Sequence, residues 1–168
     1  MNTAQPAAGR TDRIRARYAK LVAVTMFLTF DLIMFGAFVR LTDSGLGCPD
    51  WPGCYGQITP LGALDDIRAA ASALPEGPVT LPKAWIEMIH RYVGALLGLL
   101  IIAITVAAWR YRKVLAQSPW LATVILPAVC LQGAFGAWTV THQLMPAVVT
   151  AHLLGGMSLL ALLTWLSA

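Results

Sequence analysis

The chain has 168 residues, of which 58% are hydrophobic and only 12% are charged, and its net charge is +4. A soluble domain of this size needs a more polar surface, so the composition indicates an integral membrane protein. The basic residues form separate patches beside apolar segments, which argues against a nucleic-acid partner.

Four apolar stretches are long enough to cross a bilayer as helices, which takes about 20 residues each. They cover residues 21–39, 84–109, 120–140 and 146–166. The pattern predicts an all-α integral membrane protein built as a four-transmembrane-helix bundle. Residues 1–19 are predicted to be a disordered, basic cytoplasmic tail, and residues 20–168 to be the membrane domain. The first stretch is longer than the apolar region of a cleaved signal peptide, so we interpret it as a retained signal-anchor.

Charges on alternate connections predict the orientation of the chain. The tail and the connection after the second stretch are basic, whereas the connection between the first two stretches is mostly acidic. The basic residues are Arg10, Arg13, Arg15, Arg17, Lys20, Arg110, Arg112 and Lys113. By the positive-inside rule, the N-terminus is cytoplasmic and the long first connection is external. Asp31, deep in the first stretch, is expected to have a polar partner or to be neutral.

The external connection has two parts. Residues 44–56 are rich in glycine, proline and aromatic residues, which is typical of a compact loop. This loop contains Cys48 and Cys54, and a disulfide between them is expected because oxidation is permitted outside the cell. A structural role is favoured; the second interpretation is an exposed disulfide suited to electron or thiol exchange. Residues 61–74 are predicted to form a short helix, and Cys130, in the third stretch, to be buried.

Two histidines are the main candidate ligands. His90 and His152 lie inside the second and fourth stretches, and each is followed four residues later by a glycine, Gly94 and Gly156, on the same helical face. Both helices start on the outside, so both rings are expected about 8–10 Å below the outer end. Two imidazoles at one depth across a bundle favour bis-axial haem ligation, with the glycines lining the haem face. The alternative is that each histidine only hydrogen-bonds a neighbour.

Three charged residues near the outer membrane boundary each allow two interpretations. Glu87, three residues before His90, either complements the helix dipole or acts as a general base near the haem edge; spacing does not separate these. Arg40 and Arg91 either extend to the lipid headgroups or pair with haem propionates.

The chain resembles the heme A synthases in several long motifs. These are the loop segment from Phe38 to Gly56, the segment Glu87-Met-Ile-His-Arg-Tyr92, and the segments 131–140 and 146–156. The resemblance implies oxidation of the C8 methyl of heme O to a formyl group, which gives heme A for cytochrome oxidase. It also implies a bacterial inner-membrane location, His90 and His152 as iron ligands, Glu87 as the catalytic carboxylate, and a Cys48–Cys54 loop disulfide that takes part in or supports the redox chemistry.

The chain departs from the family in size. Family members generally have eight helices in two similar four-helix halves, and the second half holds a heme B cofactor. The resemblance therefore implies that heme B belongs to a missing C-terminal half or a second copy of the chain, and it makes heme O synthase a candidate partner. The alternative function is a non-catalytic four-helix b-type cytochrome that carries electrons. A quinone-dependent thiol oxidase ranks last, because the chain has no Cys-x-x-Cys pair.

Overall fold

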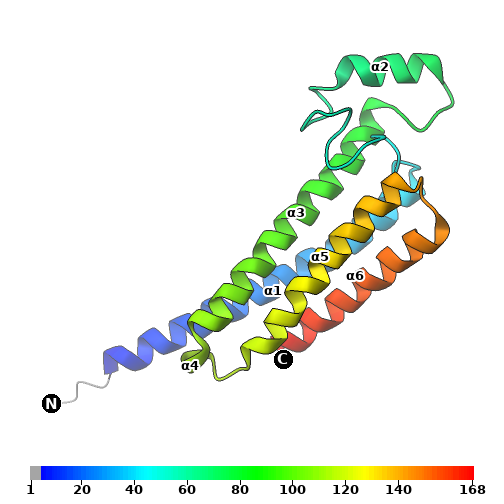
Figure 1. Ribbon diagram of the computed structural model, residues 1–168. Helices are drawn as coiled ribbons and strands as arrows, with labels where there is room; N and C mark the ends of the chain where they lie inside the picture. The colour runs from blue at the N-terminus through cyan, green and yellow to red at the C-terminus, as the bar shows by residue number, and fades with distance from the viewer. Residues whose placement is uncertain (1–4) are drawn as a thin grey trace.

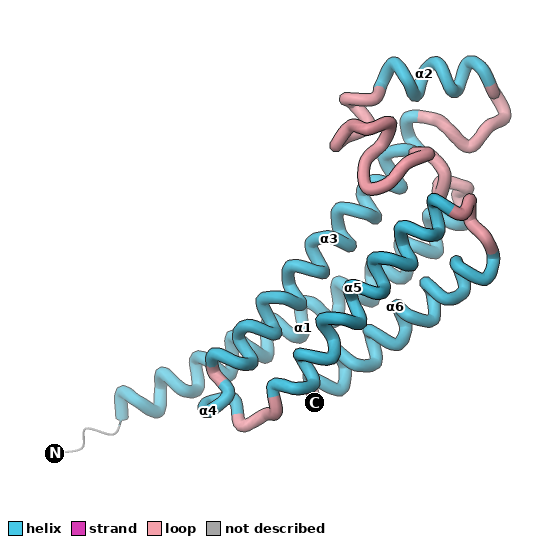
Figure 2. The backbone as a smooth tube through the Cα atoms, in the orientation of Figure 1, coloured by secondary structure: helices cyan, strands magenta, loops and turns pink. Residues whose placement is uncertain are grey.

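The computed structural model describes residues 5–168, which form six helices (Figures 1 and 2). The helices are α1 (Gln5–Leu41), α2 (Leu64–Ala73), α3 (Leu81–Arg110), α4 (Arg112–Leu115), α5 (Pro119–Thr141) and α6 (Pro146–Ser167). Four of them, α1, α3, α5 and α6, are long and apolar enough to span a membrane. The described residues contain no strand, so the predicted all-α membrane bundle is confirmed.

The N-terminal part of α1 differs from the prediction. The helix already begins at Gln5, so the expectation of a disordered tail is wrong for the described residues. Alanine, arginine and lysine dominate residues 7–20, and these residues have high helix propensity. This part of α1 projects past the ends of the other helices in Figure 1. That residues 1–19 act as a separate cytoplasmic tail stays a prediction.

The sequence sets where two of the spans begin. Thr80 caps α3 by accepting a hydrogen bond from Lys83 N at 3.4 Å, and a proline follows in the first turn. Ser118 caps α5 in the same way, with Pro119 as its first residue. The short helix α2 confirms the helix predicted within residues 61–74.

The four spans form a ring in which the histidine-bearing helices are opposite each other. α1 packs against α3 and α6, and α5 also packs against α3 and α6. This order places α3 and α6 on one diagonal and α1 and α5 on the other. Side chains on α3 and α6 can therefore meet across the middle of the bundle.

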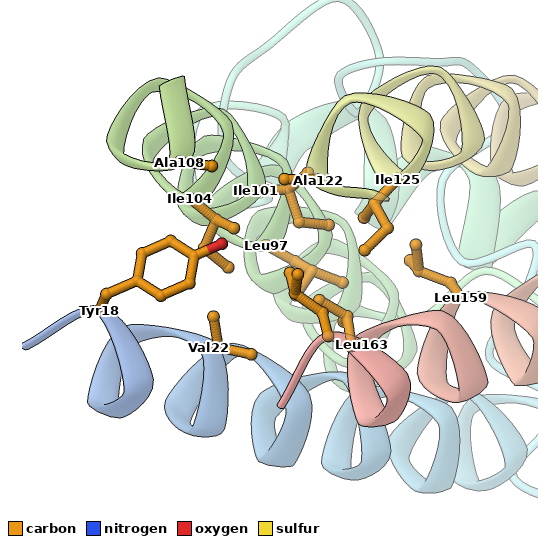
Figure 3. Packing of buried hydrophobic residues seen from close by; sticks show 11 residues of the cluster. Tyr18, Val22, Leu97, Ile101, Ile104, Ala108, Ala122, Ile125, Leu159 and Leu163 are labelled. Atoms are coloured by element: carbon orange, nitrogen blue, oxygen red, sulfur yellow. The ribbon is translucent and has the colours of Figure 1, made fainter. Parts of the chain in front are cut away.

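A closely packed apolar core fills the end of the bundle nearest the chain termini. Its members come from all four spans, and Figure 3 shows Tyr18 and Val22 of α1 facing Ile104 and Leu97 of α3. The buried members are Tyr18, Val22, Leu97, Ile101, Ile104, Ala108, Ala122, Ile125, Leu159, Leu163 and Leu166. Cys130 is exposed, so the prediction that it is a buried packing residue is wrong. The buried residues of α5 are Ala122, Ile125 and Val140, and Cys130 is on another face.

Beyond this core, toward the long loop, lies a zone that we call the central belt. It consists of residues 30–38 of α1, 89–96 of α3, 126–139 of α5 and 146–155 of α6. None of these described residues is classed as buried, although buried residues flank the belt on both sides in α1, α3 and α5 and follow it in α6. Some atoms in the belt are nevertheless buried, namely Nδ1 of His90, Nδ1 of His152 and Oε1 of Gln132.

Candidate functional site

His90 and His152 both lie in the central belt, on the diagonal helices α3 and α6. The two imidazoles are close enough to interact electrostatically across the bundle. Each side chain is only partly exposed. The structure thus brings together the two residues that the sequence selected as a ligand pair; ligation itself stays a prediction.

Each imidazole packs against a glycine of a neighbouring helix. A Cβ added to Gly36 of α1 would lie 3.1 Å from Cε1 of His90, and one added to Gly136 of α5 would lie 3.2 Å from Cε1 of His152. Sequence reasoning missed both glycines. A signal was available, since the sequence Phe-Gly-Ala occurs at residues 35–37 and again at 135–137. The two glycines occupy equivalent places on the second diagonal of the ring.

The two glycines chosen from the sequence have other neighbours. A Cβ on Gly94 would meet Cδ2 of Leu32 at 3.9 Å. Gly156 is buried, and a Cβ there would lie 3.2 Å from Nε2 of Gln132 and 3.5 Å from Cγ1 of Ile33. No imidazole atom is among the nearest atoms that a Cβ at Gly94 or Gly156 would meet. Their role as haem-face glycines stays a prediction.

Both imidazoles carry a buried nitrogen without a partner. Within residues 5–168, Nδ1 of His90 and Nδ1 of His152 are buried and have no hydrogen-bond partner. Buried polar side-chain atoms usually have one. The alternative interpretation is that each histidine only hydrogen-bonds a neighbour, but no such partner is present at Nδ1. Unpartnered polar atoms on rings from two opposite helices fit a site that a bound group completes.

Glu87 lies one turn above His90 on α3 and is tied to the long loop. Its Oε2 accepts a hydrogen bond from the backbone N of Cys48 at 2.9 Å, and its Oε1 forms an ion pair with Arg91. The side chain of Glu87 is 5% exposed and that of Arg91 is 11% exposed. Both carboxylate oxygens therefore have partners in a buried environment.

Arg91 fastens the same loop through its backbone carbonyls. Its Nη1 donates to the carbonyl oxygens of Asp50 at 2.8 Å and Pro52 at 3.2 Å, and also to that of Gly53. With Nη2 on Glu87, the guanidinium is largely occupied. A propionate contact from Arg91 stays a prediction that must compete with these bonds. Arg40, the other candidate, is exposed at the end of α1.

The loop is pinned by the predicted disulfide between Cys48 and Cys54. Both cysteines are 0% exposed and pack with Ile67, Ala84 and Met88. The interpretation that the disulfide is exposed is therefore wrong, because the loop folds down onto α3; a role of the disulfide in redox chemistry stays a prediction. Its approach is so close that a Cβ on the glycine at position 47 would lie 2.6 Å from the backbone N of Ala84.

The rest of the loop is ordered by polar contacts. The carboxylate of Asp50 accepts hydrogen bonds from Tyr55 N at 2.6 Å and Gly56 N at 2.7 Å. Partial burial, followed by the charges of Asp66 and Asp50, raises the pKa of Tyr55 above its ordinary value. Lys83 pairs with Asp43 at 3.2 Å near the start of α3. The loop is thus a fixed cover over the histidine-bearing end of α3.

Comparison with known proteins gives a consistent result. A family model described as cytochrome oxidase assembly protein (COX15-CtaA) matches residues 19–168. A heme A synthase of Shewanella oneidensis is 46% identical over 143 residues, which is 85% of this chain and 42% of that protein. A heme A synthase of Geobacillus kaustophilus is 32% identical over 140 residues, covering 83% of this chain and 38% of that protein. One of Bartonella quintana is 27% identical over 161 residues, covering 84% and 45%. The chain therefore spans less than half the length of these curated relatives.

Proposed function

Because the chain belongs to the COX15-CtaA family of cytochrome oxidase assembly proteins, we propose that it acts in heme A biosynthesis as the N-terminal, haem-binding half of a heme A synthase. The reaction would be oxidation of the C8 methyl of heme O to a formyl group. The observation that carries this proposal is the pair His90 and His152, which lie on opposite helices of the ring in the central belt and have unpartnered Nδ1 atoms.

His90 and His152 would hold the haem iron. Imidazole nitrogens are common iron ligands, and sites between facing helices of a bundle are common places for haem. The buried and unpartnered Nδ1 atoms of both rings support this choice. The bound iron would supply the redox chemistry, and the protein would supply ligation, orientation and shielding from water.

Glu87 would be the catalytic carboxylate. Converting a methyl group to a formyl group with oxygen from water releases both protons and electrons, so the reaction needs a base and an electron acceptor, and Glu87 would be the base. Glu87 is the acidic residue that α3 carries, and it lies three positions before His90 on nearly the same face. Its bonds to Cys48 N and Arg91 would hold the carboxylate in one orientation.

The proposal also covers the substrate, the partner proteins and the membrane in which the chain lies. Heme O would be the substrate, and heme O synthase the protein that supplies it. A heme B centre would be held by a further four-helix half or by a second copy of the chain, consistent with relatives more than twice as long as the matched segment. The chain would be a multi-pass protein of the bacterial inner membrane, with its N-terminus cytoplasmic and the disulfide loop outside.

The other functions have less support. The comparisons name heme A synthases and give no support to a non-catalytic b-type cytochrome. A thiol oxidase would need accessible cysteines, and Cys48 and Cys54 are fully buried.

The test of ligation is haem content after purification in mild detergent from cells that make heme O. The wild-type chain should retain haem with the absorption spectrum of a bis-histidine centre, and pigment extraction identifies the haem type. His90→Ala and His152→Ala should each lose most of it. His142→Ala is the matched control, because His142 is exposed in the turn before α6. Haem retained at the wild-type level in both belt variants would refute the ligand assignment.

The test of catalysis is heme A formation in membranes that contain heme O. Replacing Glu87 with alanine should abolish heme A while the haem spectrum remains. Unchanged product would remove Glu87 from the mechanism and favour an electron-carrying role.

A further inference from the structure

A crevice is lined by residues of α1 and by residues at the C-terminal end of α3. Figure 1 shows that these ends of α1 and α3 lie at the end of the bundle far from the long loop. Its wider part has a volume of about 360 Å³ and is lined by Arg10, Arg13, Ile14, Arg17 and Tyr111. A narrower part of about 140 Å³ is lined by Ile14, Arg17, Tyr18, Leu21, Ala107 and Tyr111. Because the two parts share Ile14, Arg17 and Tyr111, they lie next to each other along α1.

The wide part is strongly basic. Arg10, Arg13 and Arg17 are spaced three and four residues apart, so they share one face of α1. The ion pairs among the described residues are Arg68–Asp65, Lys83–Asp43 and Arg91–Glu87, and none of them involves these three arginines. Asp12 is two positions from Arg10, one from Arg13 and five from Arg17, and none of these spacings is the three or four that places two residues on one helix face. Three guanidinium groups thus line one cavity without an acidic partner.

The narrow part is apolar and leads into the membrane-spanning region. Tyr18 is 8% exposed and belongs to the core, while Leu21 and Ala107 pack against that core from α1 and α3. Tyr18 lies beside Ile104 and Ala108 in Figure 3. The crevice therefore changes from cationic to hydrocarbon-like along its length.

We propose that this crevice binds an anionic phospholipid, with its phosphate against Arg10, Arg13 and Arg17 and an acyl chain along Leu21 and Ala107. Guanidinium groups bind phosphate oxygens through charge-assisted hydrogen bonds. Basic pockets at the ends of transmembrane helices are suited to anionic headgroups. A free phosphate would use the arginines but would leave the apolar part without a function, so the shape of the crevice favours a lipid.

The surrounding contacts give the lipid a structural consequence. Arg15, on another face of α1, donates from Nε to the carbonyl oxygen of Val114 at 2.9 Å and so holds the α3–α5 connection against α1. A lipid in the crevice would neutralise the three arginines and join the projecting part of α1 to α3. We expect it to stabilise this end of the bundle.

The test uses the purified full chain in nanodiscs, either of phosphatidylcholine alone or with phosphatidylglycerol added, and measures bound phosphatidylglycerol by native mass spectrometry. The variant R13Q/R17Q should bind phosphatidylglycerol roughly tenfold more weakly than wild type. The matched control K20Q/K113Q removes the same charge from the same end, but neither residue lines the crevice. It should bind nearly as the wild type does. Ala107→Leu fills the narrow part, keeps every charge and should also weaken binding.

Three results would overturn the proposal. Equal losses in R13Q/R17Q and K20Q/K113Q would mean diffuse charge attraction without a site. Unchanged binding in Ala107→Leu would mean that no acyl chain occupies the narrow part. Thermal stabilisation of the wild type by inorganic phosphate equal to that by phosphatidylglycerol would mean a soluble-anion site. Because Ala107→Leu leaves the arginines intact, it tests the lipid even if the double variant folds poorly in phosphatidylcholine.

Discussion

The backbone N of Cys48 donates a hydrogen bond to Oε2 of Glu87 at 2.9 Å, which fixes one end of the disulfide to the helix that carries His90. Arg91 adds an ion pair to the same carboxylate and hydrogen bonds to loop carbonyls. The loop, Glu87 and His90 are thereby connected within two turns of α3. A substitution at Glu87 or Arg91 should therefore loosen the attachment of the loop to this end of α3.

The first prediction concerns the buried ion pair of Glu87 and Arg91. Glu87→Gln should destabilise the bundle by about 3–5 kcal/mol, because it leaves a buried guanidinium without its counter-charge. The double variant E87Q/R91Q should lose less stability than the sum of the two single changes. Unfolding in mixed detergent micelles, followed by circular dichroism, gives the comparison.

The control for this prediction is the pair Lys83–Asp43, whose side chains are 27% and 69% exposed. Lys83→Gln should cost no more than about 1 kcal/mol, as for other solvent-accessible pairs. Additive effects of the Glu87 and Arg91 substitutions would contradict the coupling. In E87Q/R91Q, restored stability without heme A formation would separate the structural role of Glu87 from its proposed catalytic one.

The second prediction concerns the glycines beside the imidazoles. Gly36→Ala and Gly136→Ala would place a Cβ about 3 Å from Cε1 of His90 and His152, respectively, so each ring must shift. Such overpacking costs about 1–3 kcal/mol. We expect lower haem content and altered electron paramagnetic resonance g-values in both variants.

Gly98 and Gly133 are matched controls, since a Cβ at either position meets nothing within 4 Å. Alanine there should leave the haem signal unchanged and stabilise the helix by up to about 1 kcal/mol. If all four variants gave the wild-type spectrum, the two ring-contacting glycines would have no part in haem binding.

The third prediction follows from the burial of the disulfide. Because Cys48 and Cys54 are 0% exposed, a water-soluble reductant should release their thiols slowly from the folded chain and quickly after denaturation. Mass spectrometry of alkylated protein measures both rates. Cys48→Ser/Cys54→Ser should lower stability by about 2 kcal/mol. Equal reduction rates in the folded and denatured chain would show that the loop opens readily.

The bundle was predictable because its signals are local and strong. Apolar length fixes the number of spans, and the turn-rich composition of residues 44–56 identifies the loop. The helical N-terminal part of α1 was missed because its charge suggested disorder, whereas its alanine and arginine content favours continuing the helix of the first span.

The ligand pair was predictable, but its surroundings were not. In an α-helix the Cα–Cβ bond tilts toward the N-terminus, so the ring of His90 leans away from Gly94 at i+4. The glycine that accommodates it, Gly36, is on another helix, and its proximity depends on how α1 packs against α3. The same holds for Arg91, whose partners include three carbonyls that only the folded loop brings to it.

The fourth prediction concerns Asp31, which lies near the midpoint between Lys20 and Leu41 and is exposed on α1. Its neighbours on the same face are apolar and also exposed, Phe27 by 63% and Met34 by 57%. A carboxyl at this depth without a partner costs about 2.5–3.5 kcal/mol in a bilayer. Asp31→Ala should therefore stabilise the 168-residue chain in nanodiscs, as measured by reversible unfolding.

Asp12→Ala provides the control for Asp31, because Asp12 is also exposed on α1 but lies near the N-terminal end of the helix. Its replacement should change the free energy of unfolding by no more than about 0.5 kcal/mol. The direction of the Asp31 effect is informative. A loss of stability in Asp31→Ala would mean that the carboxyl is paired in the bilayer. The ion pairs among the described residues do not include Asp31, so its partner would come from another chain or another segment. A gain of stability would identify Asp31 as an unpaired carboxyl on the lipid-facing side of α1.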